Sequence, residues 1–365
     1  MSVEFIGLVS ARNGPEGGGS RSAPPIDRDW INLISRTHEE ADFDNALIGY
    51  FASSPDGILV AAAAGAATEK LKLLIAHRPG FVSPTLAARK FATLDHLFGG
   101  RVTLNIVSGM LEADQHRDGD WLPHDDRYSR TDEYLTIMRQ AWTSDVPFDF
   151  EGHYYNIKGG TVNVQPIQKP SIPLYISGAS EGGVDVAAKH ADTYMAWGEP
   201  IEDIRERIQG INEAAAVYGR KPGFSVSFRP VLGVTEEKAW EKAHAIAEKT
   251  ASARSAASLP DDVQPDNQGS RRLLEQAAKG VDGVRDERLY FGVTTVIRTS
   301  GNTTMLVGTP DQVAESILQY IDAGATSILV RGFNQLEDTI EYGRDLIPIV
   351  RSELAHREHG ALVAG

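Results

Sequence analysis

The turn Ser177-Gly178-Ala179-Ser180 has the composition of a phosphate-binding turn. It connects the apolar run IPLYI to the helical segment EGGVDVAAKHAD. Backbone N–H groups at the start of a helix and the positive end of its dipole bind anions, and small side chains allow a phosphate to come close. A short Gly/Ser turn between a strand and a helix is also common without any ligand. The pattern alone leaves a phosphate site and an ordinary loop as alternatives.

Asn105 is a polar amide within the apolar run VTLNIVSG. A buried amide without a partner costs free energy, so its side chain is expected to form hydrogen bonds. The partner could be a neighbouring strand residue or a buried water, and it could equally be a ligand bound at the end of the strand. Residue type alone does not separate these interpretations.

Three arginines could bind an anionic group. Arg229 and Arg331 lie at the ends of apolar runs, and Arg298 lies in a long polar insertion. Converging guanidinium groups suit a tetrahedral oxyanion. Arginines at strand ends are also often paired with carboxylates, and the chain has 50 Asp and Glu residues. Anion binding and carboxylate pairing are both open for each arginine.

The chain lacks the residues of several common catalytic sites. It has no cysteine, which excludes disulfides, thiolate metal ligands and thiol nucleophiles. Its ten histidines show neither an HExxH motif nor another i, i+4 pair, so we predict no metal site. A Walker loop and a GxSxG elbow are also missing, and the glycines from Gly14 lie in an irregular loop. A bound cofactor would then perform the difficult chemistry, and flavin mononucleotide (FMN) would fit.

Eight short apolar runs recur along the chain and are expected to be strands. Their near-continuous apolarity is typical of parallel strands that are covered on both faces. The runs begin at Val3, Asn45, Lys72, Arg101, Ile172, Asp192, Gly223 and Ser327.

Segments with helical periodicity separate most of these runs. One is expected to begin at Pro84, with Ser83 as its N-cap, and to end at Gly99-Gly100. A second has an apolar stripe over residues 201–215, and a third runs from Asp311 to Gly324. The alternation of strands and helices predicts a parallel sheet.

Eight strand–helix units favour a closed (β/α)8 barrel, or TIM barrel, over an open doubly wound α/β sheet. The 365 residues exceed the roughly 250 of a plain barrel, and no linker marks a second domain. We expect one domain over residues 1–365, with a hairpin insertion near 147–170 and a lid-like insertion near 250–308. A surface insertion without function is the alternative for the second.

The ends of parallel barrel strands face a common mouth, where barrel enzymes place their sites. The strand-end residues that could meet there are Ser53, Ser54, His77, Arg78, Asn105, Ser177, Trp197, Arg229, Arg331 and Phe333.

The net charge of −14 argues against nucleic acid as a partner, because binding a phosphate backbone requires clustered Lys and Arg. A small anionic substrate stays possible, since a few arginines suffice to bind it. The first ten residues lack a basic region, and no apolar run approaches the ~20 residues that span a bilayer. Together with the absence of cysteine, this predicts a cytoplasmic protein that does not bind membranes.

One long segment and several shorter motifs occur in a characteristic order. The long segment is RPGFVSPTLAARKFATLDHLFGGRVTLNIVSG, from Arg78 to Gly109. The shorter motifs are HDDRY from His124, PLYISGAS before the fifth helix, YMAWGEP from Tyr194 and TTMLVGTPDQVAESI from Thr303. In order and spacing they resemble the flavin-dependent monooxygenases of the bacterial-luciferase-like superfamily, and among these the alkanesulfonate monooxygenases. The likeness spans nearly the whole chain.

The resemblance implies reduced FMN (FMNH₂) that a separate NAD(P)H-dependent reductase supplies, and O₂ as the oxidant of a small organic substrate. For an alkanesulfonate the products would be an aldehyde and sulfite. It also favours a homodimer or homotetramer.

Carried over by position, the resemblance also assigns site residues. Arg298 matches, with a shift of one residue, a lid arginine expected to close over flavin and substrate. Trp197 and Arg298 are expected to take part in catalysis. The flavin pocket would be formed by Asn105, Tyr128, Gly178, Ala179, Ser180 and Trp197, to which the phosphate turn adds Ser177.

The substrate-side positions depart from the alkanesulfonate pattern. The family's cysteine is replaced by Ser54, its arginine by Ser227 and its histidine by Arg229. Near the last strand, its tyrosine is replaced by Phe333 and its second histidine by Gln335. Positive charge on the last two barrel strands could replace the missing arginine in holding an anion. We expect catalytic roles for Ser54, Arg229 and Gln335, and substrate contacts from Ser227, Arg229, Arg331 and Phe333.

The leading hypothesis is a two-component FMNH₂-dependent monooxygenase that desulfonates an alkanesulfonate or oxidises a related sulfone. Three alternatives stay open: a non-sulfur substrate, hydride transfer with the deazaflavin F420 or a flavin on the same fold, and a flavin-binding barrel without turnover. The expected partners are an anionic or organosulfur small molecule, O₂ and, transiently, the flavin reductase.

Overall fold

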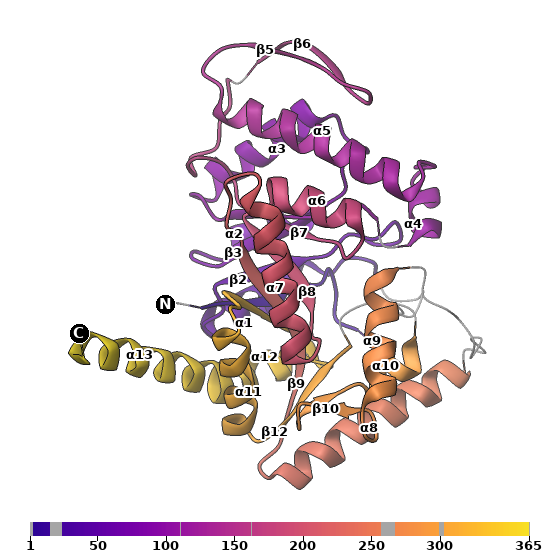
Figure 1. Ribbon diagram of the computed structural model, residues 1–365, viewed down its shortest axis with the longest axis vertical. Helices are drawn as coiled ribbons and strands as arrows, with labels where there is room; N and C mark the ends of the chain where they lie inside the picture. Colours follow the sequence, from indigo (N-terminus) through magenta and orange to yellow (C-terminus); the bar gives the residue numbers. More distant parts are fainter. Residues whose placement is uncertain are drawn as a thin grey trace.

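Eight parallel strands close into a barrel surrounded by helices (Figure 1). The computed structural model describes residues 3–14, 24–109, 111–161, 163–256, 267–298 and 303–364. Each barrel strand pairs in parallel with the next, and the pairings of β8 with β9 and of β13 with β1 complete the ring. The strands are β1 Glu4–Leu8, β2 Asn45–Ile48, β3 Lys72–His77, β4 Val102–Ile106, β7 Leu174–Ser177, β8 Thr193–Trp197, β9 Gly223–Leu232 and β13 Ser327–Val330. Every expected strand is present, which confirms the TIM barrel.

Helices follow the barrel strands and cover the outside of the sheet. Helix α3 begins at Pro84 and ends at Leu97, and its C-cap Phe98 is followed by Gly99 and Gly100, whose φ angles of 62° and 85° glycine readily adopts. Ser83 occupies the predicted N-cap position, but its side chain forms no capping hydrogen bond. The outer helices are α1 Arg28–Glu40, α2 Gly57–Ala67, α3 Pro84–Leu97, α4 Glu112–Arg117, α5 His124–Thr143, α6 Glu181–His190, α7 Ile201–Ala216, α11 Pro310–Asp322 and α12 Gln335–Glu341, which continues through η1 Tyr342–Leu346 into α13 Ile347–Ala364.

The main core lies between the strands and the helices, and a smaller apolar cluster fills the barrel. Ile6, Leu74, Tyr175 and Leu329 form this inner cluster. At the N-terminal end of the strands, the hydroxyl of Tyr175 donates to the Glu4 carboxylate at 2.5 Å. These contacts fill the N-terminal half of the barrel and leave its C-terminal mouth for ligands.

A small hairpin interrupts the barrel after α5. Its strands β5 Phe148–Glu151 and β6 Asn156–Gly160 pair antiparallel. Figure 1 shows the hairpin at the end of the molecule, beyond α5.

A larger insertion separates the last two barrel strands and covers residues 236–308. It contains α8 Glu236–Ala256, α9 Gln268–Lys279, β10 Val284–Arg285, β11 Leu289–Tyr290, α10 Gly292–Ile297 and β12 Met305–Gly308. Strand β12 pairs with the second half of β9, from Arg229 to Leu232, whereas the first half of β9 pairs with β13. The insertion thus starts at Glu236, 14 residues before the predicted start near residue 250, and residues 257–266 and 299–302 of the predicted lid lie outside the described residues.

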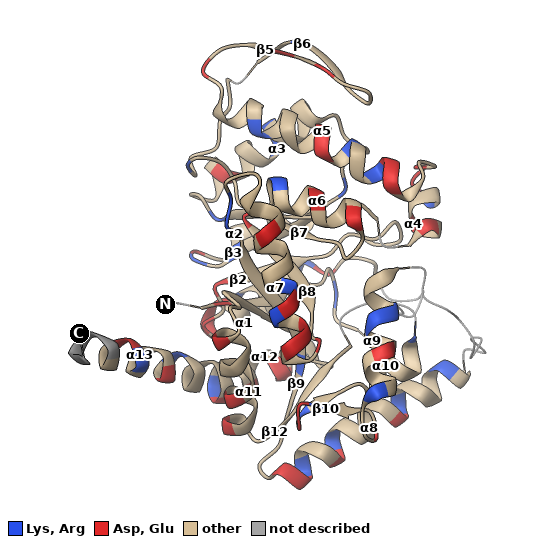
Figure 2. Cartoon of the chain, in the orientation of Figure 1, with Lys and Arg blue, Asp and Glu red and all other residues tan. Residues whose placement is uncertain are grey.

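Acidic and basic residues are interspersed along α8 and α13, as is typical of solvated helices (Figure 2). Within the described ranges, no helix combines the length and apolar composition needed to cross a membrane.

Candidate active site

Alternation along the strands determines which side chains enter the mouth of the barrel. Tyr175 and Met195 belong to the inner cluster or pack against it. Residues two positions further along a strand point to the same side, so Ser177 and Trp197 also face inward, at the mouth end.

The register of the strands shows which side chains of β4, β9 and β13 also point into the barrel. Asn105 is paired with Tyr175, and Ser227 is paired with Leu329 of the inner cluster, so both side chains face inward. The next inward positions on β9 and β13 are at the mouth. The mouth therefore gathers Asn105, Ser177, Trp197, Ser227, Arg229 and Arg331.

The turn from Ser177 to Ser180 leads directly into α6 and is built around Gly178. The φ angle of Gly178 is 154°, and a Cβ atom there would lie 2.9 Å from the Cα of Gly183. Only glycine fits this close approach. The Ser180 side chain caps α6 by accepting a hydrogen bond from the Gly183 N–H at 3.3 Å. The remaining N–H groups of the first helical turn are available to an anion.

Tyr128 of α5 packs against this turn. Its hydroxyl lies against Gly178, where a Cβ atom would come within 2.9 Å of it, and burial is the main cause that raises the pKa of Tyr128. The phenol is therefore protonated at neutral pH and keeps a hydrogen that it can donate. Tyr194 of β8 supports the turn from the other side, with its hydroxyl donating to the Gly178 carbonyl at 2.7 Å.

Asn105 has an incomplete hydrogen-bond set. Its side-chain oxygen Oδ1 is buried and has no partner among the described residues. A buried acceptor of this kind costs free energy unless a ligand or water donates to it. Its place at the mouth favours a ligand.

Trp197 lies where the insertion meets the mouth. A Cβ atom on Gly269 of α9 would lie 2.9 Å from Cζ3 of the Trp197 ring. The helix backbone therefore approaches the indole closely, and a larger residue at position 269 would push α9 away. Trp197 is half-buried, as expected for a side chain between the barrel and a covering helix.

On the neighbouring strand β9, Arg229 is buried and its guanidinium packs on an aromatic ring. Its guanidinium carbon lies 4.6 Å from the ring centroid of Phe333. The Phe333 N–H donates to Asp338 at 2.7 Å, which fixes the loop after β13. Beside it, the Arg229 N–H donates to the Thr304 carbonyl at 2.9 Å, and the Thr304 hydroxyl oxygen is buried without a partner among the described residues. Arg229 thus brings a buried positive charge to the mouth.

Arg298 ends α10 in a left-handed backbone conformation, with a φ angle of 58°. Such a conformation costs free energy for a non-glycine residue. Its Nε atom is buried and has no hydrogen-bond partner within the described ranges. The next residues, 299–302, lie outside the described part of the chain, so the predicted closing role stays a prediction.

Ser54 and Gln335, both predicted to be catalytic, have local structural partners. Ser54 is exposed, and its hydroxyl donates to the Phe51 carbonyl at 2.8 Å within a turn. Gln335 accepts a hydrogen bond from Ser10 at 2.6 Å, and Ser10 also accepts one from the Trp30 indole. These contacts connect α12 to β1 and α1, and their geometry gives no support to catalysis.

The structure adds a group of charged residues that the motifs do not single out. Glu199, directly after β8, is buried and bound by Arg207 of α7 and Arg272 of α9. The one available signal is the acidic residue of the WGEP segment at a strand end. Its partners are far away in sequence, and no periodicity predicts them.

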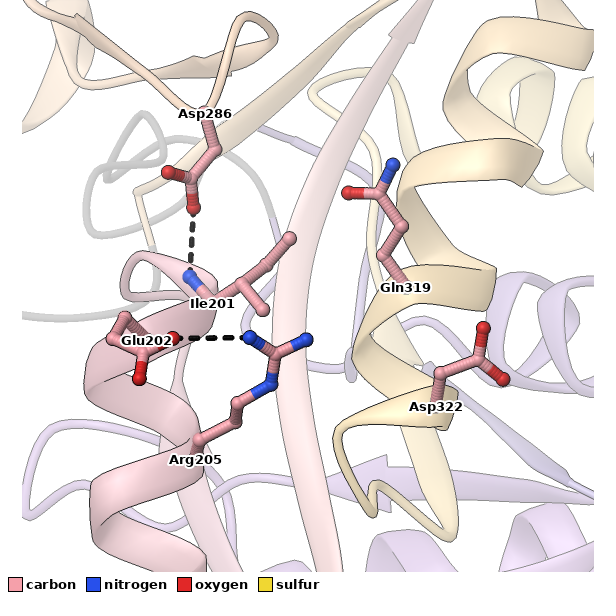
Figure 3. Close-up of a pocket in the computed structure, with 6 residues that line it drawn as sticks. All are labelled: Ile201, Glu202, Arg205, Asp286, Gln319 and Asp322. Carbon is pink, nitrogen blue, oxygen red and sulfur yellow. Dashed lines mark hydrogen bonds and ion pairs between the residues drawn. The ribbon is translucent and has the colours of Figure 1, made fainter.

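A separate surface pocket of about 380 Å³ lies outside the barrel between α7, α11 and the β10–β11 turn (Figure 3). Arg205 pairs with Glu202 there at 3.0 Å, and Asp286 accepts from the Ile201 N–H at 2.7 Å. None of the predicted site residues lines this pocket. Among the described residues, no group of His, Asp or Glu side chains could hold a metal ion.

Comparison with known proteins agrees with this architecture. Riboflavin lyase (RcaE), solved with modified FMN and riboflavin, has a TM-score of 0.76 and 22% identity, covering 97% of this chain and 92% of its own. EDTA monooxygenase (EmoA) from Chelativorans sp. BNC1 has a TM-score of 0.75 and 20% sequence identity. The match covers 96% of this chain and 94% of EmoA. An F420-dependent secondary alcohol dehydrogenase has a TM-score of 0.67 and 17% sequence identity. The match covers 96% of this chain and 99% of the dehydrogenase. At these identities the similarity shows a shared fold.

A family model described as luciferase-like monooxygenase matches residues 3–327. This match covers most of the chain, from the first barrel strand to the start of the last. The chain therefore belongs to the luciferase-like monooxygenase family.

Proposed function

We propose that this protein is the oxygenase of a two-component system and uses FMNH₂, delivered by a separate reductase, to oxidise a small anionic organosulfur compound. The observation that carries the proposal is the turn at Gly178, which combines a positive φ angle, a capped helix and a neighbouring protonated tyrosine. This combination favours a ligand with a phosphate group.

The residues at the mouth fit FMN in two places. The N–H groups at the start of α6 and the hydroxyls of Ser180 and Tyr128 would hold the phosphate. The unpartnered Oδ1 atom of Asn105 would accept a hydrogen bond from an N–H of the flavin ring. Bound FMNH₂ would supply the two electrons that allow O₂ to react with the substrate.

The protein's own contribution is then binding, orientation and exclusion of water. Trp197 and the α9 backbone at Gly269 cover one side of the mouth. Apolar cover of this kind strengthens electrostatic interactions in the site and protects reactive species from water. We assign Arg298 a closing role on the grounds of its unsatisfied Nε atom and its place at the end of α10.

We assign the anionic part of the substrate to Arg229. The guanidinium is buried and stacks on Phe333. A sulfonate has the negative charge and the acceptor oxygens that a guanidinium binds. The balanced reaction converts an alkanesulfonate, O₂ and FMNH₂ into an aldehyde, sulfite, FMN, water and a proton.

Hydride transfer with F420 is the second candidate, because an F420-dependent dehydrogenase has the same fold over 96% of this chain. F420 also carries phosphate, so the turn at Gly178 suits either cofactor. Anaerobic titration with each reduced cofactor separates the two candidates. We expect saturable binding of FMNH₂ and weaker binding of reduced F420.

The proposal is tested with a panel of alkanesulfonates and sulfones, incubated with the protein, FMN, NADH and a flavin reductase. We expect O₂-dependent release of sulfite or sulfinate with at least one compound, and none when the protein is omitted. Failure of FMNH₂ to bind would contradict the proposed cofactor, whereas binding without product from any compound would contradict the organosulfur substrate.

A further inference from the structure

Glu199 binds two arginines from different parts of the chain. Its carboxylate accepts hydrogen bonds from Nη2 of Arg207 at 2.9 and 3.1 Å and from Nη2 of Arg272 at 2.7 Å. The residue is only 3% exposed, and its backbone carbonyl accepts from the buried hydroxyl of Tyr320 at 2.9 Å. Both the main chain and the side chain of Glu199 are thus held in place.

The contact with Arg272 joins the barrel to the insertion. Arg207 and Glu199 belong to the barrel rim, whereas Arg272 lies on α9. Gly269, three residues earlier on α9, lies against Trp197, so the same face of the helix makes both contacts. Removal of the Glu199 charge would leave Arg207 and Arg272 without the carboxylate that both of them bind.

On its other side, the network reaches the phosphate turn. The Arg207 guanidinium lies near enough to the Tyr194 side chain to act on its pKa, and the Tyr194 hydroxyl donates to the Gly178 carbonyl at 2.7 Å. This carbonyl and the N–H of Ala179 belong to one planar trans peptide and therefore point in opposite directions. By holding the carbonyl, Tyr194 fixes the direction of an N–H in the turn that would bind the phosphate.

We infer that Glu199 is a positioning residue that couples occupancy of the phosphate turn to the seating of helix α9 on the mouth, through Gly178, Tyr194, Arg207, Glu199 and Arg272. The inference rests on the proposed function, because it takes the ligand of the turn to be the FMN phosphate. Coupling of this kind is reciprocal: a phosphate that orders the turn stabilises α9, and a well-seated α9 strengthens phosphate binding.

Hydrogen–deuterium exchange of the full-length protein tests the coupling without a turnover assay. Amide exchange in α9 is measured anaerobically without flavin, with FMNH₂, and with reduced riboflavin, which lacks the phosphate. In the wild type we expect FMNH₂ to slow exchange in α9 by about fivefold or more, the lower end of typical coupling strengths, and riboflavin to have little effect.

Three variants assign the effect to the network. In Glu199→Gln and in the milder Arg272→Met and Tyr194→Phe, the α9 response to FMNH₂ should be lost, while exchange in the barrel strands stays as in the wild type. Glu202→Gln is the matched control, because Glu202 lies three residues after Glu199, in the first turn of α7, and pairs with the exposed Arg205 at 3.0 Å. This control should keep the full response.

The outcomes separate the inference from the function on which it rests. If FMNH₂ binds and α9 does not respond in the wild type, or if Arg272→Met and Tyr194→Phe respond normally, the coupling is wrong and the proposed cofactor is unaffected. If FMNH₂ does not bind to the wild type, the proposed function fails and the coupling fails with it. Should Glu199→Gln fail to fold, the other two variants still decide.

Discussion

At the scale of single residues, the two sides of the mouth present different chemistry. The side formed by Asn105, Tyr128 and the Gly178 turn offers neutral donors and acceptors, with an unsatisfied oxygen at Asn105. The other side carries the buried charge of Arg229. A flavin and an anionic substrate would thus meet between surfaces that are each suited to one of them.

Substitution of Arg229 by Met should weaken binding of the anionic substrate. Loss of one charge-assisted hydrogen bond raises KM by about 10- to 100-fold, whereas the affinity for FMNH₂ is expected to stay the same. Steady-state kinetics and anaerobic flavin titration measure the two effects. Arg205→Met, on the outside of the barrel, is the control. An unchanged KM in Arg229→Met would show that this arginine does not hold the substrate.

Substitution of Gly178 by Ala should weaken FMNH₂ binding by about tenfold or more, because the new Cβ atom would displace the turn and cost at least one hydrogen bond to the phosphate. Gly219→Ala is a matched control, since Gly219 also has a positive φ angle, of 66°, and a Cβ atom there meets nothing within 4 Å. Both variants are expected to lose some stability, and only the first should lose flavin affinity. Equal affinities would count against the turn as the phosphate site.

At the scale of secondary-structure elements, the periodic parts of the chain were predictable, whereas long-range partners were not. The eight strands are near-continuous apolar runs, and α3, α7 and α11 have clear apolar stripes or end signals. The sequence predicts that the second half of β9 is a strand. Its pairing with β12, however, joins residues more than seventy positions apart, which no local pattern indicates. The ion pair of Glu199 with Arg272 escapes sequence reasoning for the same reason.

Two predicted helix N-termini differ in whether the N-cap side chain forms its hydrogen bond. Thr309 and Gln312 form a capping box at α11, with both reciprocal hydrogen bonds present. Thr309→Ala should therefore lower the free energy of unfolding by about 1 kcal/mol. Ser83→Ala at α3 should have little effect, because the Ser83 side chain forms no capping bond. Denaturant unfolding of both variants compares them, and equal losses would contradict this assignment.

At the scale of the whole molecule, two buried histidines should make stability depend on pH. Burial lowers the pKa of His38 to about 4 and that of His77 to about 3. His38 bonds the Ile34 carbonyl at 2.7 Å and accepts from the Leu8 N–H at 3.2 Å, and His77 bonds Tyr134 at 2.8 Å. Only a neutral imidazole has a ring nitrogen that can accept a hydrogen bond, as His38 does from Leu8.

The unfolded chain takes up protons at these histidines below pH 6.5, whereas the folded chain does not until about pH 4, so stability falls as the pH drops through this window. Each histidine contributes a slope of up to about 1.4 kcal/mol per pH unit. Urea unfolding between pH 6.5 and 4.5 should show a smaller slope in His77→Gln than in the wild type. An unchanged slope in His77→Gln would refute the assignment.

The most direct test of the central claim is the affinity for reduced FMN compared with that for reduced riboflavin, both measured anaerobically by titration. The two ligands differ by the phosphate alone. If the turn at Gly178 binds a flavin phosphate, FMNH₂ should bind at least about tenfold more tightly, and Gly178→Ala should remove most of the difference. Equal affinities of the wild-type protein for the two flavins would contradict the account.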